Sequence, residues 1–121
     1  MKKKILVADD DTDLVQLLRD MLEFEGYETL AAYEGVRTIE AAHKQRPDLI
    51  LLDVQMPAGT GQSVLKALRS KEATKKIPII VISGVQQNDL AEEVKKLGAQ
   101  DFILKPYEKV DLIAKVKNLL S

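Results

Sequence analysis

The sequence contains no cysteine and no tryptophan, and aromatic residues make up only 4% of it. Without cysteine the chain has no disulfide framework, no thiolate zinc site and no thiol nucleophile, so a reducing, cytoplasmic compartment is the default expectation. Long hydrophobic runs are also missing, because stretches such as Ile79 to Ile82 are far shorter than a membrane span. The lysines at positions 2–4 precede too short an apolar segment to form a signal peptide.

An excess of charge of either sign is lacking as well. The 18 basic and 19 acidic residues leave a formal net charge of -1 at pH 7. The overall charge therefore gives no reason to expect nucleic acid or an anionic membrane as a partner. With 121 residues, of which 45% are hydrophobic, the chain is long enough for one continuous core. We expect a single domain spanning residues 1–121.

The sequence alternates short apolar runs with stretches of helical spacing. The predicted strands are Lys4–Ala8, Tyr27–Ala32, Leu49–Leu52, Pro78–Ile82 and Asp101–Leu104. The helical stretches that follow them are Leu14–Leu22, Val36–Gln45, Val64–Leu68, Leu90–Leu97 and Val110–Leu120. Gly26 and Gly98 are expected to end the first and the fourth of these helices. Several strands are apolar without alternation, which is typical of a parallel sheet covered by helices on both faces. In such open sheets ligands bind outside the carboxyl ends of the strands.

Polar side chains follow four of the predicted strands. Asp9 and Asp10 follow the first, Asp53 the third, Ser83 the fourth and Lys105 the fifth. Carboxylate oxygens favour a hard cation such as Mg²⁺, which would also offset their mutual repulsion. A lysine and a hydroxyl can hold phosphate oxygens, and an aspartate can become an aspartyl phosphate. The set therefore indicates phosphoryl transfer, which needs positioning and charge neutralisation above all.

The stretch DDDTD at residues 9–13 divides into two groups. Asp11 stands directly before a helical stretch and is a good N-cap, and Asp13 in the first turn opposes the helix dipole. We assign both to the helix. The only histidine, His43, lies at a polar helix end and is expected on the surface.

The acidic stretch allows other interpretations. A calcium loop starting at Asp9 is rejected, because Leu14 stands where such a loop needs glycine and Asp20 where it needs glutamate. A phosphatase of the haloacid-dehalogenase type would use Asp9 as nucleophile and Asp11 as general acid, but it leaves Asp53 unexplained. A dinucleotide site is excluded because the glycine-rich first turn is absent.

Four segments resemble the receiver domain of two-component response regulators: LVADDD, LILLDVQMP, IVISG and DFILKPY. Each is weak alone, but all four occur in the order of that family and each closes a predicted strand. The resemblance covers essentially the whole chain. It implies a flavodoxin-like α/β fold of five strand–helix units with strand order 2-1-3-4-5.

The resemblance also implies a role for each residue of the site. Asp53 corresponds to the phosphoacceptor, Asp10 to a direct Mg²⁺ ligand and Asp9 to the acidic neighbour that reaches the metal through water. The backbone carbonyl of Gln55 corresponds to a further metal ligand. Ser83 and Lys105 correspond to the groups that bind the phosphoryl oxygens. Ser83 and Phe102 also correspond to the positions that change during activation. The Lys105-Pro106 peptide bond corresponds to one that is often cis in this family.

The same resemblance implies partners. The phosphoryl donor would be a phosphohistidine on a sensor histidine kinase or a histidine phosphotransfer protein. The fourth helix, last strand and last helix would carry the signal to a downstream protein, with a phosphorylation-dependent homodimer as one form of output. The domain would be a switch that catalyses only its own phosphorylation and slow dephosphorylation. It would make no direct contact with nucleic acid and none with a membrane.

The chain departs from the family pattern at several positions. Thr60 stands where the family more often has an acidic residue, and Gly84 replaces the commoner alanine. Phe102 has no hydroxyl, so it can switch only by ring burial. Gln55 and Val85 occupy positions that modulate dephosphorylation, and neither offers a charge to position water. A domain that never accepts phosphate remains an alternative, although no acceptor or metal group is lost.

Overall fold

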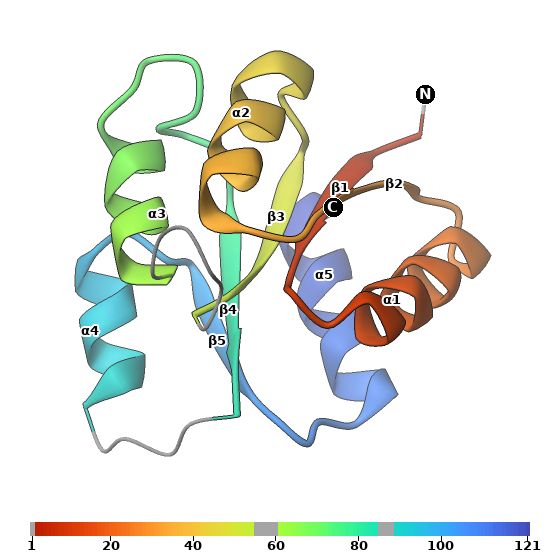
Figure 1. Cartoon of the computed structure of the whole chain (residues 1–121). Coiled ribbons are helices and arrows are strands. Elements are labelled where there is room, and N and C mark those ends of the chain that lie inside the picture. Colours follow the sequence, from red (N-terminus) through yellow and green to blue (C-terminus); the bar gives the residue numbers. More distant parts are fainter. Residues whose placement is uncertain (1, 55–60, 85–88) are drawn as a thin grey trace.

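The computed structural model of the chain describes residues 2–54, 61–84 and 89–121. Its centre is a five-stranded parallel sheet in the order β2-β1-β3-β4-β5, which confirms the predicted topology (Figure 1). The strands are β1 Lys4–Ala8, β2 Glu28–Ala32, β3 Leu49–Asp53, β4 Ile79–Ser83 and β5 Asp101–Leu104. The helices are α1 Thr12–Phe24, α2 Gly35–Gln45, α3 Gly61–Arg69, α4 Leu90–Lys96 and α5 Lys109–Leu120.

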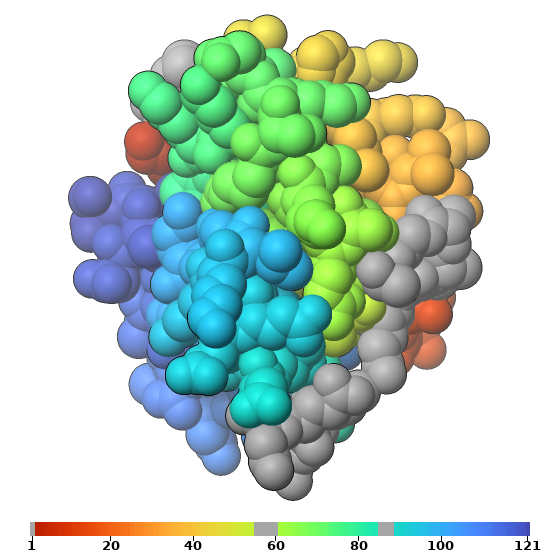
Figure 2. Space-filling view, turned by 90° about the vertical axis from the view of Figure 1, so that its left-hand side faces the viewer, coloured from red at the N-terminus to blue at the C-terminus, as the bar shows by residue number. Residues whose placement is uncertain are grey.

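The helices cover the two faces of the sheet unequally. Helices α1 and α5 lie on one face, and α2, α3 and α4 lie on the other (Figure 1). Figure 2 looks onto the second face, where α3 and α4 lie next to one another. Strands β1, β3 and β4 contribute buried side chains to both cores, which explains why their sequences are apolar without alternation.

The observed elements begin and end close to the predicted positions. Helices α2, α3 and α5 begin one to three residues earlier than predicted, at Gly35, Gly61 and Lys109. Such first-turn residues carry little of the apolar periodicity on which the prediction depended. Strands β3 and β4 extend to Asp53 and Ser83, so both of these polar residues belong to the sheet itself.

Local signals at the helix ends act as predicted. The carboxylate of Asp11 accepts a hydrogen bond of 3.1 Å from the backbone N–H of Leu14 and caps α1. Gly26 and Gly98, after α1 and α4, have φ of 97° and 112°, a conformation that favours glycine. Within the described part of the chain, every helix is too short or too polar to cross a membrane.

Candidate functional site

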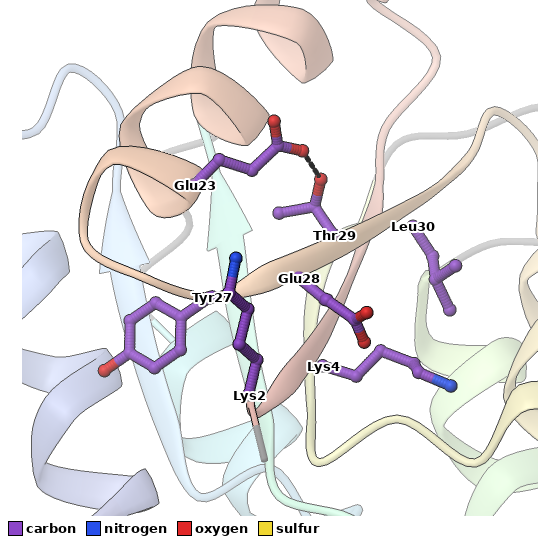
Figure 3. A pocket seen from close by; sticks show the side chains of 7 residues that line it. All are labelled: Lys2, Lys4, Glu23, Tyr27, Glu28, Thr29 and Leu30. Atoms are coloured by element: carbon purple, nitrogen blue, oxygen red, sulfur yellow. Dashed lines mark hydrogen bonds between the residues drawn. The ribbon is translucent and has the colours of Figure 1, made fainter.

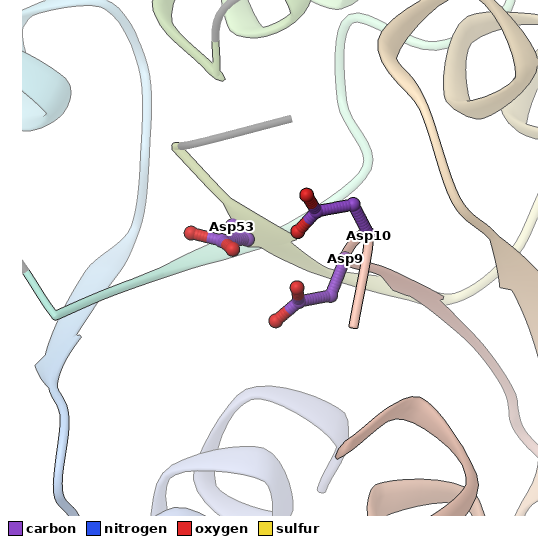
Figure 4. A group of neighbouring side chains, drawn as sticks. All are labelled: Asp9, Asp10 and Asp53. Atoms are coloured by element: carbon purple, nitrogen blue, oxygen red, sulfur yellow. The ribbon is translucent and has the colours of Figure 1, made fainter. Parts of the chain in front are cut away.

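The site lies at the carboxyl ends of the strands. Asp9 and Asp10 follow β1, and Asp53 is the last residue of the neighbouring strand β3. One carboxylate oxygen from each residue lies within 4.8 Å of the other two. Figure 4 shows the three side chains gathered at the end of these strands. The sheet therefore brings together carboxylates that are 43 or more positions apart in the sequence.

Lys105 supplies the positive charge of the site. Its Nζ lies 3.0 Å from Oδ2 of Asp9 and 3.6 Å from Oδ2 of Asp53. Burial by itself would lower the pKa of Lys105, but the hydrogen bond to Asp9 and the negative charge of Asp53 together raise it. The ammonium is therefore charged at neutral pH, and it offsets the repulsion between two carboxylates that are almost completely buried.

Asp9 and Asp10 differ in their surroundings. Asp9 is 4% exposed, and its Oδ1 accepts a hydrogen bond from the backbone N–H of Asp11 while Oδ2 accepts from Lys105. Asp10 is exposed. The carboxylate of Asp9 thus already has two donors, whereas Asp10 faces solvent next to Asp53.

The three carboxylates fit a magnesium ion by their chemistry. Mg²⁺ is coordinated by oxygen ligands and takes one or two protein carboxylates, with water or phosphate oxygens completing its shell. Asp10, which is exposed, and Asp53, which is buried, both offer such oxygens beside Asp9. The cluster could therefore hold this cation.

Ser83 and Gly61 complete the surroundings of Asp53. Ser83 ends β4, is fully buried and accepts a 2.7 Å hydrogen bond at its backbone carbonyl from the N–H of Lys105. This bond fixes the backbone of Lys105 next to the end of β4. A Cβ added to Gly61 would lie 2.3 Å from the Cα of Val54, so α3 can approach the end of β3 only because residue 61 is glycine.

The structure also places most of the other residues that the sequence singled out. Phe102 is half-buried on β5 and packs against the core on the α2–α3–α4 face. The Lys105-Pro106 peptide bond is cis, as expected. His43 is exposed and Asp13 lies in the first turn of α1, which confirms both predictions. Gln55, Thr60 and Val85 lie outside the described residues.

Sequence reasoning missed Gly61 and Tyr107. The need for glycine at position 61 depends on a contact between α3 and β3 that no local pattern reveals. Tyr107 stands two residues after Lys105, and burial together with the negative charge of Asp9 raises the pKa of its phenol. Its place at the end of the DFILKPY segment was the only signal available.

Comparison with known proteins identifies the family. The response regulator receiver domain family matches residues 5–117 of the chain. The chain belongs to this family. Receiver domains are signalling switches that bind Mg²⁺ at an acidic pocket, and their family implies histidine kinase partners and output targets.

Individual relatives are similar in sequence to this receiver domain over nearly its whole length. It is 31% identical over 121 residues to the polar-differentiation response regulator DivK of Brucella anthropi, covering 100% of this chain and 98% of DivK. It is 36% identical over 117 residues to the transcriptional regulatory protein PrrA of Mycobacterium tuberculosis, covering 97% of this chain and 49% of PrrA. It thus spans about half of that longer protein.

A solved structure shows the same fold. The chemotaxis protein CheY4 of Vibrio cholerae superposes on this receiver domain with a TM-score of 0.91 and 29% identity. The match covers 98% of this chain and 99% of CheY4. The flavodoxin-like, CheY-like architecture expected from the sequence is therefore confirmed.

Proposed function

We propose that residues 1–121 form one receiver domain in which Asp53 accepts a phosphoryl group from a phosphohistidine. The observation that carries this proposal is the position of the Asp53 carboxylate. It lies at the end of β3, 6% exposed, with the Lys105 ammonium on one side and the Asp9 and Asp10 carboxylates close by. A nucleophilic oxygen, a cation for the phosphoryl group and a set of metal ligands therefore lie together at the carboxyl ends of the strands.

Magnesium would be held by Asp10, Asp53 and the backbone carbonyl of Gln55, with Asp9 reaching it through water. When bound, this ion would neutralise part of the negative charge on the carboxylates and on the phosphoryl oxygens. The proposal rests on three carboxylates, each of which has an oxygen within 4.8 Å of an oxygen of the other two.

The transfer needs one bond to form and one to break. A carboxylate oxygen of Asp53 attacks the phosphorus, the bond from phosphorus to the donor imidazole nitrogen breaks, and the imidazole leaves with the electron pair and takes up a proton. Lys105 then exchanges part of its contact with Asp53 for a phosphoryl oxygen, and the Ser83 hydroxyl donates to another. Hydrolysis later returns Asp53 to a carboxylate and releases inorganic phosphate.

The signal would leave the domain through α4, β5 and α5. Lys105 follows β5 directly, and its backbone N–H is bonded to the last residue of β4, so a shift at the site reaches β5 first. Phe102 on β5 is half-buried and can change its burial. A groove between β5 and α5, lined in part by Phe102, Leu104 and Tyr107, offers a surface for a downstream protein or a second copy.

Chemical phosphorylation tests the proposal. The chain is incubated with a small phosphodonor and Mg²⁺, and the phosphate is mapped by mass spectrometry. We expect label on Asp53, none in Asp53→Asn and none without metal, while the matched variant Asp13→Asn is labelled as the wild type is. Label on Asp9 would favour the phosphatase-type mechanism, and an unlabelled wild-type chain would favour a pure interaction domain.

A further inference from the structure

The charges of this domain are separated along the axis of the sheet. In a parallel α/β fold all strands start at one end, where the helices also finish. We call this the strand-start end, and it comprises residues 2–4, 25–28, 43–48, 66–78, 95–101 and 117–121. In Figure 1 it includes the N-terminus and the α3–β4 connection in the upper part of the molecule.

Most basic residues lie at the strand-start end. It holds 13 of the 18 basic residues and five of the 19 acidic residues, a formal charge of +8, or +6 when Glu23 and Glu93 in the last turns of α1 and α4 are counted with it. The rest of the chain carries -9, so a net charge of -1 conceals two opposite ends. The basic residues of the strand-start end are Lys2, Lys3, Lys4, Lys44, Arg46, Lys66, Arg69, Lys71, Lys75, Lys76, Lys95, Lys96 and Lys117.

Compensation of helix dipoles does not account for this excess. Each helix places roughly half a negative charge at its C-terminus, so five helices contribute about -2.5 at the strand-start end. The formal charge there is about three times larger and of opposite sign. Eleven of the 13 basic residues are exposed, all except Lys4 and Arg69. Most of the positive charge therefore faces solvent.

Local ion pairs remove only part of the charge. Lys117 contacts Glu25 at 2.8 Å and Lys75 contacts Glu72 at 2.7 Å. Among the described residues, Lys71 and Lys76 form no ion pair, although both are exposed in the α3–β4 connection. Unpaired lysines on one end of the molecule add their attraction for any anionic surface that covers them.

Two pockets at this end carry charges of both signs. One is lined by Lys2 and Lys4, but also by Glu23 and Glu28, as Figure 3 shows. The other adds Arg46 and Asp48 to Lys2, Lys4 and Glu28. Lys4 and Glu28 are register partners in the pairing of β1 with β2, so a basic and an acidic residue stand side by side there. The lysines without an acidic partner, such as Lys71 and Lys76, lie in the α3–β4 connection and not in these pockets. An extended anionic surface can contact them, whereas a small ligand bound in a pocket cannot.

The proportion of lysine to arginine at this end indicates which class of partner it would bind. Eleven of the 13 are lysines, which act as hydrated point charges, and only two are arginines. Protein interfaces are depleted in lysine and enriched in arginine and aromatic residues. Recognition of single-stranded nucleic acid uses aromatic stacking, and base readout relies heavily on arginine. Tyr27 is the one aromatic residue at this end, and it is half-buried.

We propose that the strand-start end binds reversibly to an anionic lipid surface. Polybasic surfaces without apolar insertion bind such membranes through additive lysine contacts that fall off within a Debye length. Five-residue strands separate this end from the phosphoacceptor by about 17 Å. A domain bound in this way presents Asp53 away from the lipid, so the site stays accessible to a phosphodonor and the proposal does not depend on phosphorylation.

Vesicle sedimentation tests the proposal with the unphosphorylated chain. The probes are vesicles of half phosphatidylglycerol and half phosphatidylcholine, vesicles of phosphatidylcholine alone, and a short DNA duplex, at about 0.05 M and about 0.5 M salt. We expect binding to the anionic vesicles at low salt and its loss at high salt. Equal binding to both kinds of vesicle, no binding to either, or tighter binding to the duplex than to anionic vesicles would overturn the proposal.

Two matched variants separate location from net charge. Lys71→Gln with Lys76→Gln removes two exposed charges from the strand-start end, and Arg37→Gln with Lys109→Gln removes two exposed charges elsewhere. The first pair should lower the partition onto anionic vesicles by about five-fold per lysine, hence about twenty-five-fold, and the second by much less. Equal losses would refute a role for this end, and urea unfolding checks that both variants fold as the wild type does.

Discussion

The two ends of the sheet use charge in opposite ways. At the site end, Asp9 and Asp53 are 4% and 6% exposed, and each lies within 4 Å of one lysine. At the strand-start end, eleven basic side chains face solvent and most of them lack a partner among the described residues. Buried charges interact strongly in pairs, whereas exposed charges are screened individually and matter through their sum. The first arrangement suits chemistry on one group, and the second suits attraction over a surface.

The largest expected difference between the ends concerns backbone packing. Gly61→Ala places a Cβ against the backbone of Val54, next to Asp53, and should lower the free energy of unfolding by about 3 kcal/mol. Gly26→Ala at the strand-start end meets no atom within 4 Å and should cost only about 1–2 kcal/mol for its positive φ. Urea unfolding of both variants measures this difference, and equal losses would contradict a tighter packing at the site.

A second, smaller effect concerns the central cation of the site. Lys105→Met leaves two buried carboxylates without their ammonium and should lower the free energy of unfolding by about 2 kcal/mol. Added Mg²⁺ should stabilise this variant more than the wild type, because its carboxylates have no competing cation. The exposed lysine of Lys109→Met is the control, with an expected change within about 0.5 kcal/mol. Urea titrations with and without magnesium decide between the two outcomes.

The smallest effect concerns an ion pair at the strand-start end. The hydrogen bond and the charge of Lys117 lower the pKa of Glu25, so the pair stabilises the fold above the ordinary glutamate pKa. This contribution is lost as the pH falls through the lowered pKa of the folded state. In Lys117→Met the carboxyl resonance of Glu25 should titrate at higher pH by NMR, and the stabilities of variant and wild type should converge in acid. An unchanged titration would show that the pair does not form in solution.

Much of this molecule follows from local sequence. Apolar runs without alternation predicted the parallel sheet, and Asp11, Gly26 and Gly98 marked helix ends where the structure has them. The chemistry of the site was also predictable, because polar residues directly after buried strands meet at one edge whatever the details of packing. Asp9, Asp10, Asp53, Ser83 and Lys105 were identified in this way, and the structure places all five at the carboxyl ends of their strands.

Contacts between distant segments were decided only by the tertiary structure. The sequence shows three aspartates at positions 9–11, but Asp9 turns toward Lys105, Asp10 faces solvent and Asp11 caps α1. The glycine required at position 61 depends on how closely α3 approaches β3. The same holds for charge: a sequence total of -1 argued against anionic partners, yet folding gathers +8 at one end. Local patterns determine the elements because they depend on neighbouring residues, whereas burial and electrostatic fields depend on which elements the fold brings together.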